Sequence, residues 1–294
     1  MALRFEGIRK GYPRLRRRFG EIAGYIQLLR PFTLIAPFIA GIFGTLAPLK
    51  SISTSNIYTA IYVGVTLALA QACGQVINQY VDAELDAEIK PYRPIPSGVV
   101  SKEGALGLAW LLSIAAVGRS FTVSIKFGLI TLALIFFAVF YSLPPLSPRK
   151  IHPILNIAWV SIARGFLPIL ATFSIFGDVN SALLYSILGF VWLLGFQSTK
   201  DIPDVKGDRK YGIKTIPNTY GETGLIVLML ASTIIYTAIS ILFCKPLMLL
   251  NLPLAAASIL TFKKQSRITE NTYAWACFYI GLGMIYILMF VSER

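Results

Sequence analysis

Long apolar runs separated by short polar stretches fill most of the chain between residues 22 and 291. A helix that crosses a bilayer needs about 20 mainly apolar residues. Nine runs meet or approach that length: 22–47, 56–79, 103–118, 125–143, 154–176, 181–200, 221–243, 246–262 and 272–291. The third and eighth runs are the shortest, and Pro31, Pro37 and Pro168 predict kinks. The pattern therefore predicts an all-α, polytopic membrane protein with nine transmembrane helices.

The composition agrees with a membrane protein rather than a soluble domain. Of the 294 residues, 55% are hydrophobic and 14% are charged, and the mean hydropathy is +0.67. Soluble domains carry about 25% charged residues. The three cysteines (Cys73, Cys244 and Cys277) lie apart in apolar runs, and His152 is the single histidine. These residues predict neither a zinc site, nor a disulfide framework, nor histidine-based catalysis.

The net charge of +13 is better explained by membrane topology than by a nucleic-acid partner. If the N-terminus is cytosolic, 21 of the 27 basic residues lie in cytosolic segments. Five lie outside (Lys50, Arg119, Lys126, Lys245 and Arg294), and Arg164 lies within the fifth run. This bias favours a cytosolic N-terminus, an odd number of spans and a location in the cell membrane. We expect a basic, interfacial segment at 1–20 and a single transmembrane domain at 21–294.

The acidic residues are concentrated where two of the apolar runs end. Seven of the fourteen lie in two short stretches, Asp82, Glu84, Asp86 and Glu88 and then Asp201, Asp204 and Asp208. Each stretch follows an even-numbered run on the cytosolic side, and basic residues and an Ile-Pro pair come after each. Asp82 and Asp86 have the same spacing as Asp204 and Asp208. This match predicts two four-helix repeats in parallel orientation, plus one further helix.

Helical spacing gives these acids a common chemistry. Residues three or four apart share a helix face, so Asn78, Asp82 and Asp86 align at one helix end. Asp201, Asp204 and Asp208 align in the same way at the other. Oxygen ligands of this kind suit Mg²⁺, which is held by few carboxylates together with substrate phosphates. Two facing clusters predict two or more Mg²⁺ ions around one diphosphate, with basic loop residues as its further partners.

Three stretches then match a known pattern. The stretch 78-NQYVDAELD-86, with 93-RPIPSG-98, resembles the first acidic motif, NDxxDxxxD, of the UbiA superfamily of intramembrane prenyltransferases. The stretch 200-KDIPDVKGDRKYGIKTIP-217 is similar to the second motif, DxxDxxxD. Between them, 141-YSLPPLSPRK-150 resembles the family's Tyr-Ser/Thr-x-Pro-Pro loop with its following basic residue. Their order and spacing match, and the resemblance covers all but about the first twenty residues.

The resemblance implies a nine-helix bundle around a central cavity, with a cap of cytosolic loops. The implied enzyme is a Mg²⁺-dependent prenyltransferase that transfers a prenyl group from a polyprenyl diphosphate to a lipophilic acceptor in the membrane. The acceptor classes are an aromatic quinone precursor, a chlorophyll-type ring or a glycerol-phosphate lipid. By position, the metal ligands are Asn78, Asp82, Asp86, Asp201, Asp204 and Asp208. The diphosphate contacts are Arg93, Lys150, Lys200 and Lys214, with Arg149 as the rival to Lys150, and Tyr141 lies near the allylic carbon.

Three points stay open at the level of the sequence. Gln79 stands where the family motif has an acid, which puts a metal-ligand role for this position in doubt. Arg164 is either one half of a structural ion pair or part of a cavity wall. A transporter of a divalent cation or phosphorylated solute is the main alternative function, although its site is expected near the bilayer midplane. A non-catalytic scaffold leaves the matched acidic spacings unexplained.

Overall fold

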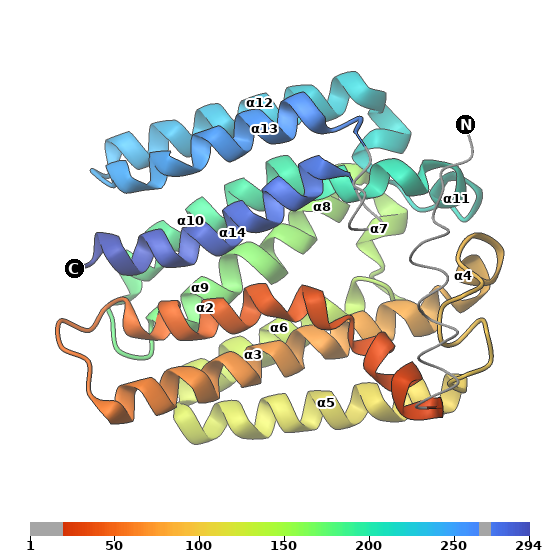
Figure 1. The fold of residues 1–294 in the computed structure, drawn as a ribbon, viewed down its shortest axis with the longest axis horizontal. Helices are drawn as coiled ribbons and strands as arrows, with labels where there is room; N and C mark the ends of the chain where they lie inside the picture. Colours follow the sequence, from red (N-terminus) through yellow and green to blue (C-terminus); the bar gives the residue numbers. More distant parts are fainter. Residues whose placement is uncertain (1–19, 265–271) are drawn as a thin grey trace.

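The computed structural model describes residues 20–264 and 272–294, and within these ranges the chain forms helices and no strands. The predicted N-terminal segment, 1–20, lies almost entirely outside the described residues. The helices, including short 3-10 turns (η1, η3, η4) and one π-helical turn (η2), are Gly20–Leu29, η1 Pro31–Leu34, α2 Ile35–Leu46, α3 Thr54–Val81, α4 Ala83–Ile89, α5 Lys102–Val123, α6 Ile125–Phe140, α7 Pro148–Ile151, α8 Pro153–Ser161, η2 Ile162–Phe166, α9 Leu167–Phe173, α10 Val179–Phe196, η3 Gln197–Asp204, α11 Val205–Lys210, α12 Ile216–Leu242, η4 Pro246–Asn251, α13 Leu252–Thr261 and α14 Tyr273–Ser292. The long helices run side by side along one axis (Figure 1).

The number of membrane-spanning helices can be compared with the prediction of nine. Among the described residues, six helical segments are long and apolar enough to cross a bilayer. The helices Gly20–Leu29 and Pro31–Leu46 meet at an angle of 41°, and they add a seventh span if the bent pair is counted as one. The segments α6 and η4–α13 are shorter apolar helices of 16 residues each. The protein is thus an all-helical membrane protein with six to seven spans by length and composition, and the count of nine stays a prediction.

Local sequence explains where the long helices begin. A Ser, Thr or Asp stands just before an apolar run, and its side chain accepts a hydrogen bond from a backbone N–H of the first turn. These caps are Ser53, Ser101, Ser124, Asp178 and Thr272. The third span is longer than predicted, because α5 begins one residue before the predicted run and continues to Val123 instead of ending at 118. Ser124 comes directly after the end of α5 and caps α6, which is shorter than α5.

The three prolines predicted to kink their helices lie in different local structures. The break at Pro31 is confirmed, because Arg30 adopts a left-handed backbone conformation (φ 50°) before it. Pro168 lies in the first turn of α9, directly after the π-helical turn η2. Pro37 lies in the first turn of α2, where a proline removes no intrahelical hydrogen bond, and α2 continues through it.

Glycines set the closest approaches between the helices. A Cβ atom on Gly41 of α2 would lie 2.2 Å from the Cα of Gly64 in α3. A Cβ atom on Gly165 of η2 would lie 2.4 Å from the carbonyl oxygen of Gly189 in α10. Small residues allow backbones to pack this tightly in membranes. The second contact fixes η2 against α10, which positions one wall of the cavity described below.

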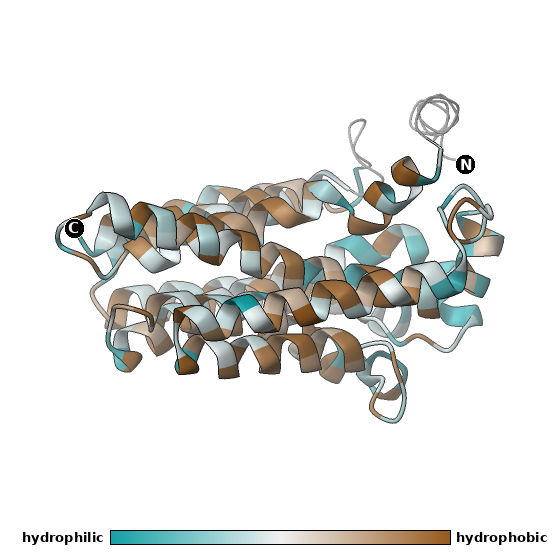
Figure 2. Cartoon of the chain, turned by 90° about the horizontal axis from the view of Figure 1, so that it is seen from below, coloured by the Kyte–Doolittle hydropathy of each residue, from teal (hydrophilic) through white to brown (hydrophobic). Residues whose placement is uncertain are grey.

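Hydrophobic and hydrophilic residues separate along the bundle. Hydrophobic residues cover the length of the helices, whereas hydrophilic residues gather at the end that carries α4, α7 and α11, on the right of both views (Figure 2). These three short helices lie in the loops between predicted spans: α4 after α3, α7 before α8, and α11 before α12. The polar end of the bundle is therefore built from the loops in which the sequence places its acidic stretches.

Candidate active site

A cavity of about 760 Å³ lies between the helices and reaches the polar end of the bundle. Its volume falls within the range of about 300–1,000 Å³ that is typical of ligand pockets. Ten of the predicted site residues line it: Asn78, Asp82, Asp86, Arg93, Tyr141, Arg149, Lys200, Asp201, Asp204 and Asp208. Apolar and aromatic side chains, including Leu134, Phe137 and Trp159, line it as well. The two acidic stretches, 122 positions apart in the sequence, thus border one space.

The first acidic stretch keeps its helical spacing across a break in the helix. The helix α3 ends at Val81, and Asp82 has a non-helical conformation (φ −86°, ψ 8°) before α4 begins. The backbone N–H of Asp82 still donates to the carbonyl of Asn78, and that of Asp86 donates to the carbonyl of Asp82. Asn78, Asp82 and Asp86 therefore all face the cavity, as the spacing predicts.

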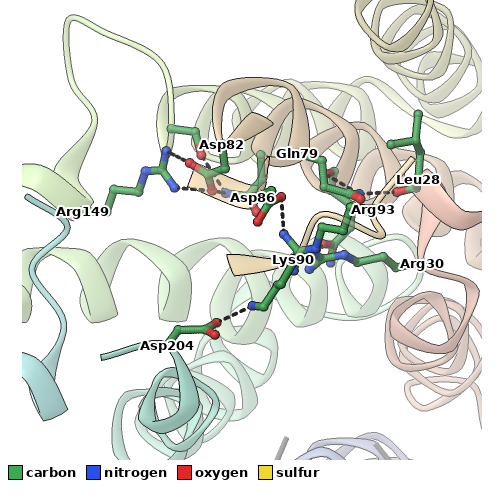
Figure 3. Close-up of polar contacts among 12 residues, drawn as sticks. Leu28, Arg30, Gln79, Asp82, Asp86, Lys90, Arg93, Arg149 and Asp204 are labelled. Atoms are coloured by element: carbon green, nitrogen blue, oxygen red, sulfur yellow. Dashed lines mark hydrogen bonds and ion pairs between the residues drawn. The ribbon is translucent and has the colours of Figure 1, made fainter. Parts of the chain in front are cut away.

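Asp82 and Arg149 form a two-pronged ion pair (Figure 3). The two guanidinium nitrogens lie 2.8 and 2.6 Å from the two carboxylate oxygens. The amide of Asn78 also donates to Asp82, at 2.9 Å. Burial lowers the pKa of Arg149, but the hydrogen bonds and charge of Asp82 outweigh it, so the pKa lies above its ordinary value. Arg149 is therefore held as a buried cation at the cavity wall.

Further basic residues pair with the remaining acids. Arg93 donates to Asp86, and Lys200 donates to the neighbouring Asp201. Burial raises the pKa of Asp86, although its contact with Arg93 opposes the rise. A third pair joins the two acidic stretches directly, because the ammonium of Lys90 lies 2.7 Å from the carboxylate of Asp204 (Figure 3).

The donor chemistry of the cavity suits Mg²⁺. All six predicted ligands offer oxygen, and all six line the same space. Within the described residues, no three acidic, histidine or cysteine side chains gather tightly enough to form a ready-made metal cage. Mg²⁺ seldom uses such a cage, because it keeps several waters and binds one or two carboxylates plus substrate phosphates. The residues present therefore fit the ion.

Gln79 lines the cavity, but its side chain makes hydrogen bonds that an ionised acid could not make. Its side chain is buried, and its amide nitrogen donates to the carbonyl oxygens of Leu28 (2.8 Å) and Gln75 (3.2 Å). A carboxylate cannot donate these two bonds. Gln79 thus ties α3 to the end of the helix Gly20–Leu29, just before the break at Pro31 (Figure 3).

Two predicted diphosphate contacts lie outside the cavity lining. Lys150 is exposed, and its neighbour Arg149 occupies the cavity wall instead. Lys214 is also exposed, and its ammonium donates to the carbonyl of Ile151 at 2.9 Å. Its backbone N–H donates to the carbonyl of Arg149 at 2.7 Å. Lys214 therefore holds α7, the short helix that carries Arg149.

Several lining residues lie outside the predicted set of metal ligands and diphosphate contacts, although the cavity-wall interpretation of Arg164 was one of the two left open by the sequence. Lys90, Arg30 and Arg164 add three basic groups to the cavity, and Gln71, Gln75 and Gln197 add amides. One signal in the sequence could have indicated part of this set. Gln71, Gln75 and Gln79 recur at intervals of four beside Asn78 and Asp82, which predicts a polar stripe along α3.

Comparison with known proteins assigns the chain to a family. The model of the UbiA prenyltransferase family matches residues 27–291. The chain belongs to the UbiA prenyltransferase family, as the three motifs indicate.

Individual curated relatives match about half of the chain at roughly one-third sequence identity. A digeranylgeranylglyceryl phosphate synthase of Korarchaeum cryptofilum is 31% identical over 158 residues, or 52% of this chain and 54% of that protein. A probable chloroplastic homogentisate phytyltransferase 2 of Oryza sativa is 33% identical over 156 residues, or 47% of this chain and 39% of that protein. The matched region therefore spans about half or less of these curated relatives.

A solved structure shares the fold. A UbiA homolog from Archaeoglobus fulgidus, bound to GPP and Mg²⁺, superimposes with a TM-score of 0.63 at 18% sequence identity. The match covers 92% of this chain and 98% of that one. At this level of identity the likeness defines the fold, and the site of this chain has to be argued from its own residues.

Proposed function

We propose that this protein is an intramembrane prenyltransferase, which moves a prenyl group from a polyprenyl diphosphate to a lipophilic acceptor. The observation that carries the proposal is the meeting of two acidic stretches and their basic partners at one end of an otherwise largely apolar-walled cavity. Family membership and the names of the relatives support it. The acceptor belongs to the aromatic, chlorophyll-type or glycerol-phosphate classes.

In this proposal the acids hold Mg²⁺ and the bases hold the diphosphate. Asn78, Asp82 and Asp86 form one ligand set, and Asp201, Asp204 and Asp208 form the second, for two or more ions. Ions held by these residues would supply the positive charge that offsets the charge developing on the departing diphosphate. Arg93, Arg149, Lys200 and Lys90 lie beside the acids and bind the phosphate oxygens when the ion pairs exchange partners. Lys214 acts by positioning α7, and Arg149 takes the role that the sequence also allowed for Lys150.

The reaction breaks the allylic C–O bond, and its electron pair leaves with the diphosphate. The acceptor supplies the electron pair of the new bond and releases a proton. Tyr141 lies at the cavity wall with the guanidinium of Arg149 5.7 Å from its ring centre. This place beside a proposed diphosphate contact supports a position for Tyr141 near the allylic carbon. Phe137 and Trp159 pack against each other in the same wall and exclude water from the carbocation.

The proposal includes a membrane topology. Nine spans, counting α6 and η4–α13, place both acidic stretches at the same membrane face. The excess of basic residues on that face makes it cytosolic, together with the N-terminus. The same arrangement disfavours a transporter, since transporters hold their substrate near the bilayer midplane between broken helices.

A substrate screen tests the proposal. Purified protein is incubated with Mg²⁺, a prenyl diphosphate and acceptors of the three classes, and products are identified by mass spectrometry. We expect a prenylated product that depends on Mg²⁺. Metal-driven solute flux in liposomes, without any covalent product, would instead identify a transporter.

A further inference from the structure

Arg164 occupies an unusual place in the cavity wall. It lies in the π-helical turn η2, inside the span Pro153–Phe173, and lines the cavity. Among the described residues, no side chain or carbonyl forms a hydrogen bond or ion pair with its guanidinium, although Tyr141, Tyr279 and Asp201 lie within electrostatic range. A cation inside a membrane is costly and usually marks function. The structure thus favours the cavity-wall interpretation of Arg164 over the structural ion pair.

The other basic residues that line the cavity each have a hydrogen-bond or ion-pair partner. Within the lining, Lys90, Arg93, Arg149 and Lys200 each pair with a carboxylate, and Arg30 donates to Gln75. A second arginine lies in a spanning helix: Arg119, predicted to lie outside the third run, belongs to the longer α5. It donates to the hydroxyl of Thr66 and the carbonyl of Tyr62, both at 3.1 Å. Its guanidinium also lies 3.6 Å from the ring centre of Tyr62. Arg164 therefore differs from its neighbours, because no residue in the described part of the chain forms a hydrogen bond or ion pair with its guanidinium.

The backbone around Arg164 is firmly placed. Gly165 packs directly on Gly189 of α10, and the hydroxyl of Tyr286 approaches the Arg164 carbonyl at 3.5 Å. Gly189 precedes Asp201 on the continuous helix Val179–Lys210. At 1.5 Å per residue, the backbone of Arg164 lies roughly 18 Å along the helix axis from that of Asp201. Its long side chain nevertheless brings the guanidinium within electrostatic range of Asp201 and Lys200. A π-helical turn of this kind often occurs at functional sites.

We propose that Arg164 binds an anionic oxyacid group, a phosphate or a carboxylate, on the acceptor. This inference rests on the proposed function. The diphosphate has its own cations at the polar end, and the prenyl chain carries no charge. The acceptor is then the remaining substrate that can neutralise this further cation of the cavity wall. A guanidinium binds either oxyacid through paired, charge-assisted hydrogen bonds.

The test uses two acceptor pairs that differ only in the oxyacid. One pair is a prenylated glycerol phosphate and its dephosphorylated alcohol, and the other is a hydroxybenzoic acid and its amide. Wild type, Arg164→Gln and Arg164→Lys are compared, with Arg119→Gln as the control arginine inside a span. Geranylgeranyl diphosphate with Mg²⁺ is the donor. Binding of a non-reactive thio-analogue of this donor reports whether each variant retains a folded diphosphate site.

We expect Arg164→Gln to raise KM for the preferred anionic acceptor by about 10- to 100-fold and to abolish the preference over its neutral partner. KM for the donor and binding of its analogue stay unchanged. Arg164→Lys retains part of the preference, and Arg119→Gln retains all of it. The pair that responds identifies the source of the oxyacid, phosphate on a lipid or carboxylate on a ring.

The inference is overturned if Arg164→Gln weakens binding of the diphosphate analogue while the preference for the anionic acceptor persists. It is also overturned if wild type prefers the neutral partner in both pairs. A different failure, no turnover by wild type with any acceptor of the three classes, contradicts the proposed function itself.

Discussion

The two ends of the bundle use acidic residues in opposite ways. At the end away from the cavity, Glu293 accepts hydrogen bonds from Tyr185 (2.6 Å) and Lys245 (2.7 Å) through its carboxylate. Its backbone carbonyl accepts another from Lys50 at 2.7 Å. One acid therefore ties together α10, α14 and the loops before α3 and η4.

At the polar end, five carboxylates border a cavity and four of them pair with a basic residue. Such pairs can exchange partners with a metal ion and a diphosphate, because the space beside them is large enough for a ligand. The comparison teaches that an ion pair beside a cavity supports binding chemistry, whereas an ion pair that joins packed segments supports the fold. Mutations at the two ends should separate activity from stability.

The largest effect is expected from the acids of the site. Asp82→Ala and Asp204→Ala should each lower kcat/KM by about 100-fold or more, since each removes a proposed metal ligand. Glu84→Ala is the matched control, because Glu84 lies in the same stretch but is exposed. Turnover with varied Mg²⁺ measures the effect. Equal losses in all three variants would show that the stretch acts through its general charge.

The next effect distinguishes two neighbouring basic residues. Arg149→Gln should lower kcat/KM by about tenfold or more, because Asp82 loses its two-pronged partner and the diphosphate loses a cation. Lys150→Gln should leave kcat/KM unchanged, because Lys150 is exposed and outside the cavity lining. Steady-state kinetics with a varied donor checks both. The reverse result would return the diphosphate contact to Lys150.

At the opposite end the effect should fall on stability alone. Glu293→Gln should lower the free energy of unfolding by about 1–2 kcal/mol and leave kcat unchanged. Glu222→Gln is the control, because Glu222 and its partner Lys263 are both exposed. Thermal unfolding in detergent compares the two variants with wild type. A loss of activity at an unchanged Tm would contradict the structural role of Glu293.

The same residue gives a pH prediction. Burial raises the pKa of Glu293, but the hydrogen bonds from Lys245 and Tyr185 outweigh it, so its folded pKa lies below the ordinary value. A lowered folded pKa stabilises the fold above the unfolded pKa, about 4.3, and this contribution is lost as pH falls through the folded pKa. The Tm difference between wild type and Glu293→Gln should therefore be present at neutral pH and shrink below about pH 4.

The smallest effect concerns Gln79. Gln79→Ala removes two buried hydrogen bonds and should lower the free energy of unfolding by about 1–2 kcal/mol. The Mg²⁺ concentration needed for half-maximal turnover should not change, because the side chain points to backbone carbonyls. Thermal unfolding and a Mg²⁺ titration measure the two quantities. A higher Mg²⁺ requirement at an unchanged Tm would make Gln79 a metal ligand after all.

Local rules explain which parts of the site were predictable. The spacing of Asn78, Asp82 and Asp86 placed them on one face, and this held across the break at Asp82 because the backbone hydrogen bonds still join residues four apart. The start of α6 at Ile125 also agrees with the predicted run, and the cap at Ser124 explains it locally.

Other parts depend on tertiary packing, which a single sequence does not encode locally. The pair of Lys90 with Asp204 joins residues 114 positions apart. The choice between Arg149 and Lys150 depends on the orientation of α7, which the backbone of Lys214 fixes. The placement of Arg164 depends on the contact of Gly165 with Gly189. Each of these is a long-range contact that spacing rules cannot give.

The central claim is that the two acidic stretches form one metal–diphosphate site, and donor binding tests it most directly. Binding of a non-reactive prenyl diphosphate analogue to the purified protein is measured with and without Mg²⁺, for wild type, Asp82→Asn and Asp204→Asn. We predict Mg²⁺-dependent binding by wild type and its loss in both variants, although the two residues belong to different stretches. Binding that persists in either variant, or that needs no Mg²⁺, would contradict the account.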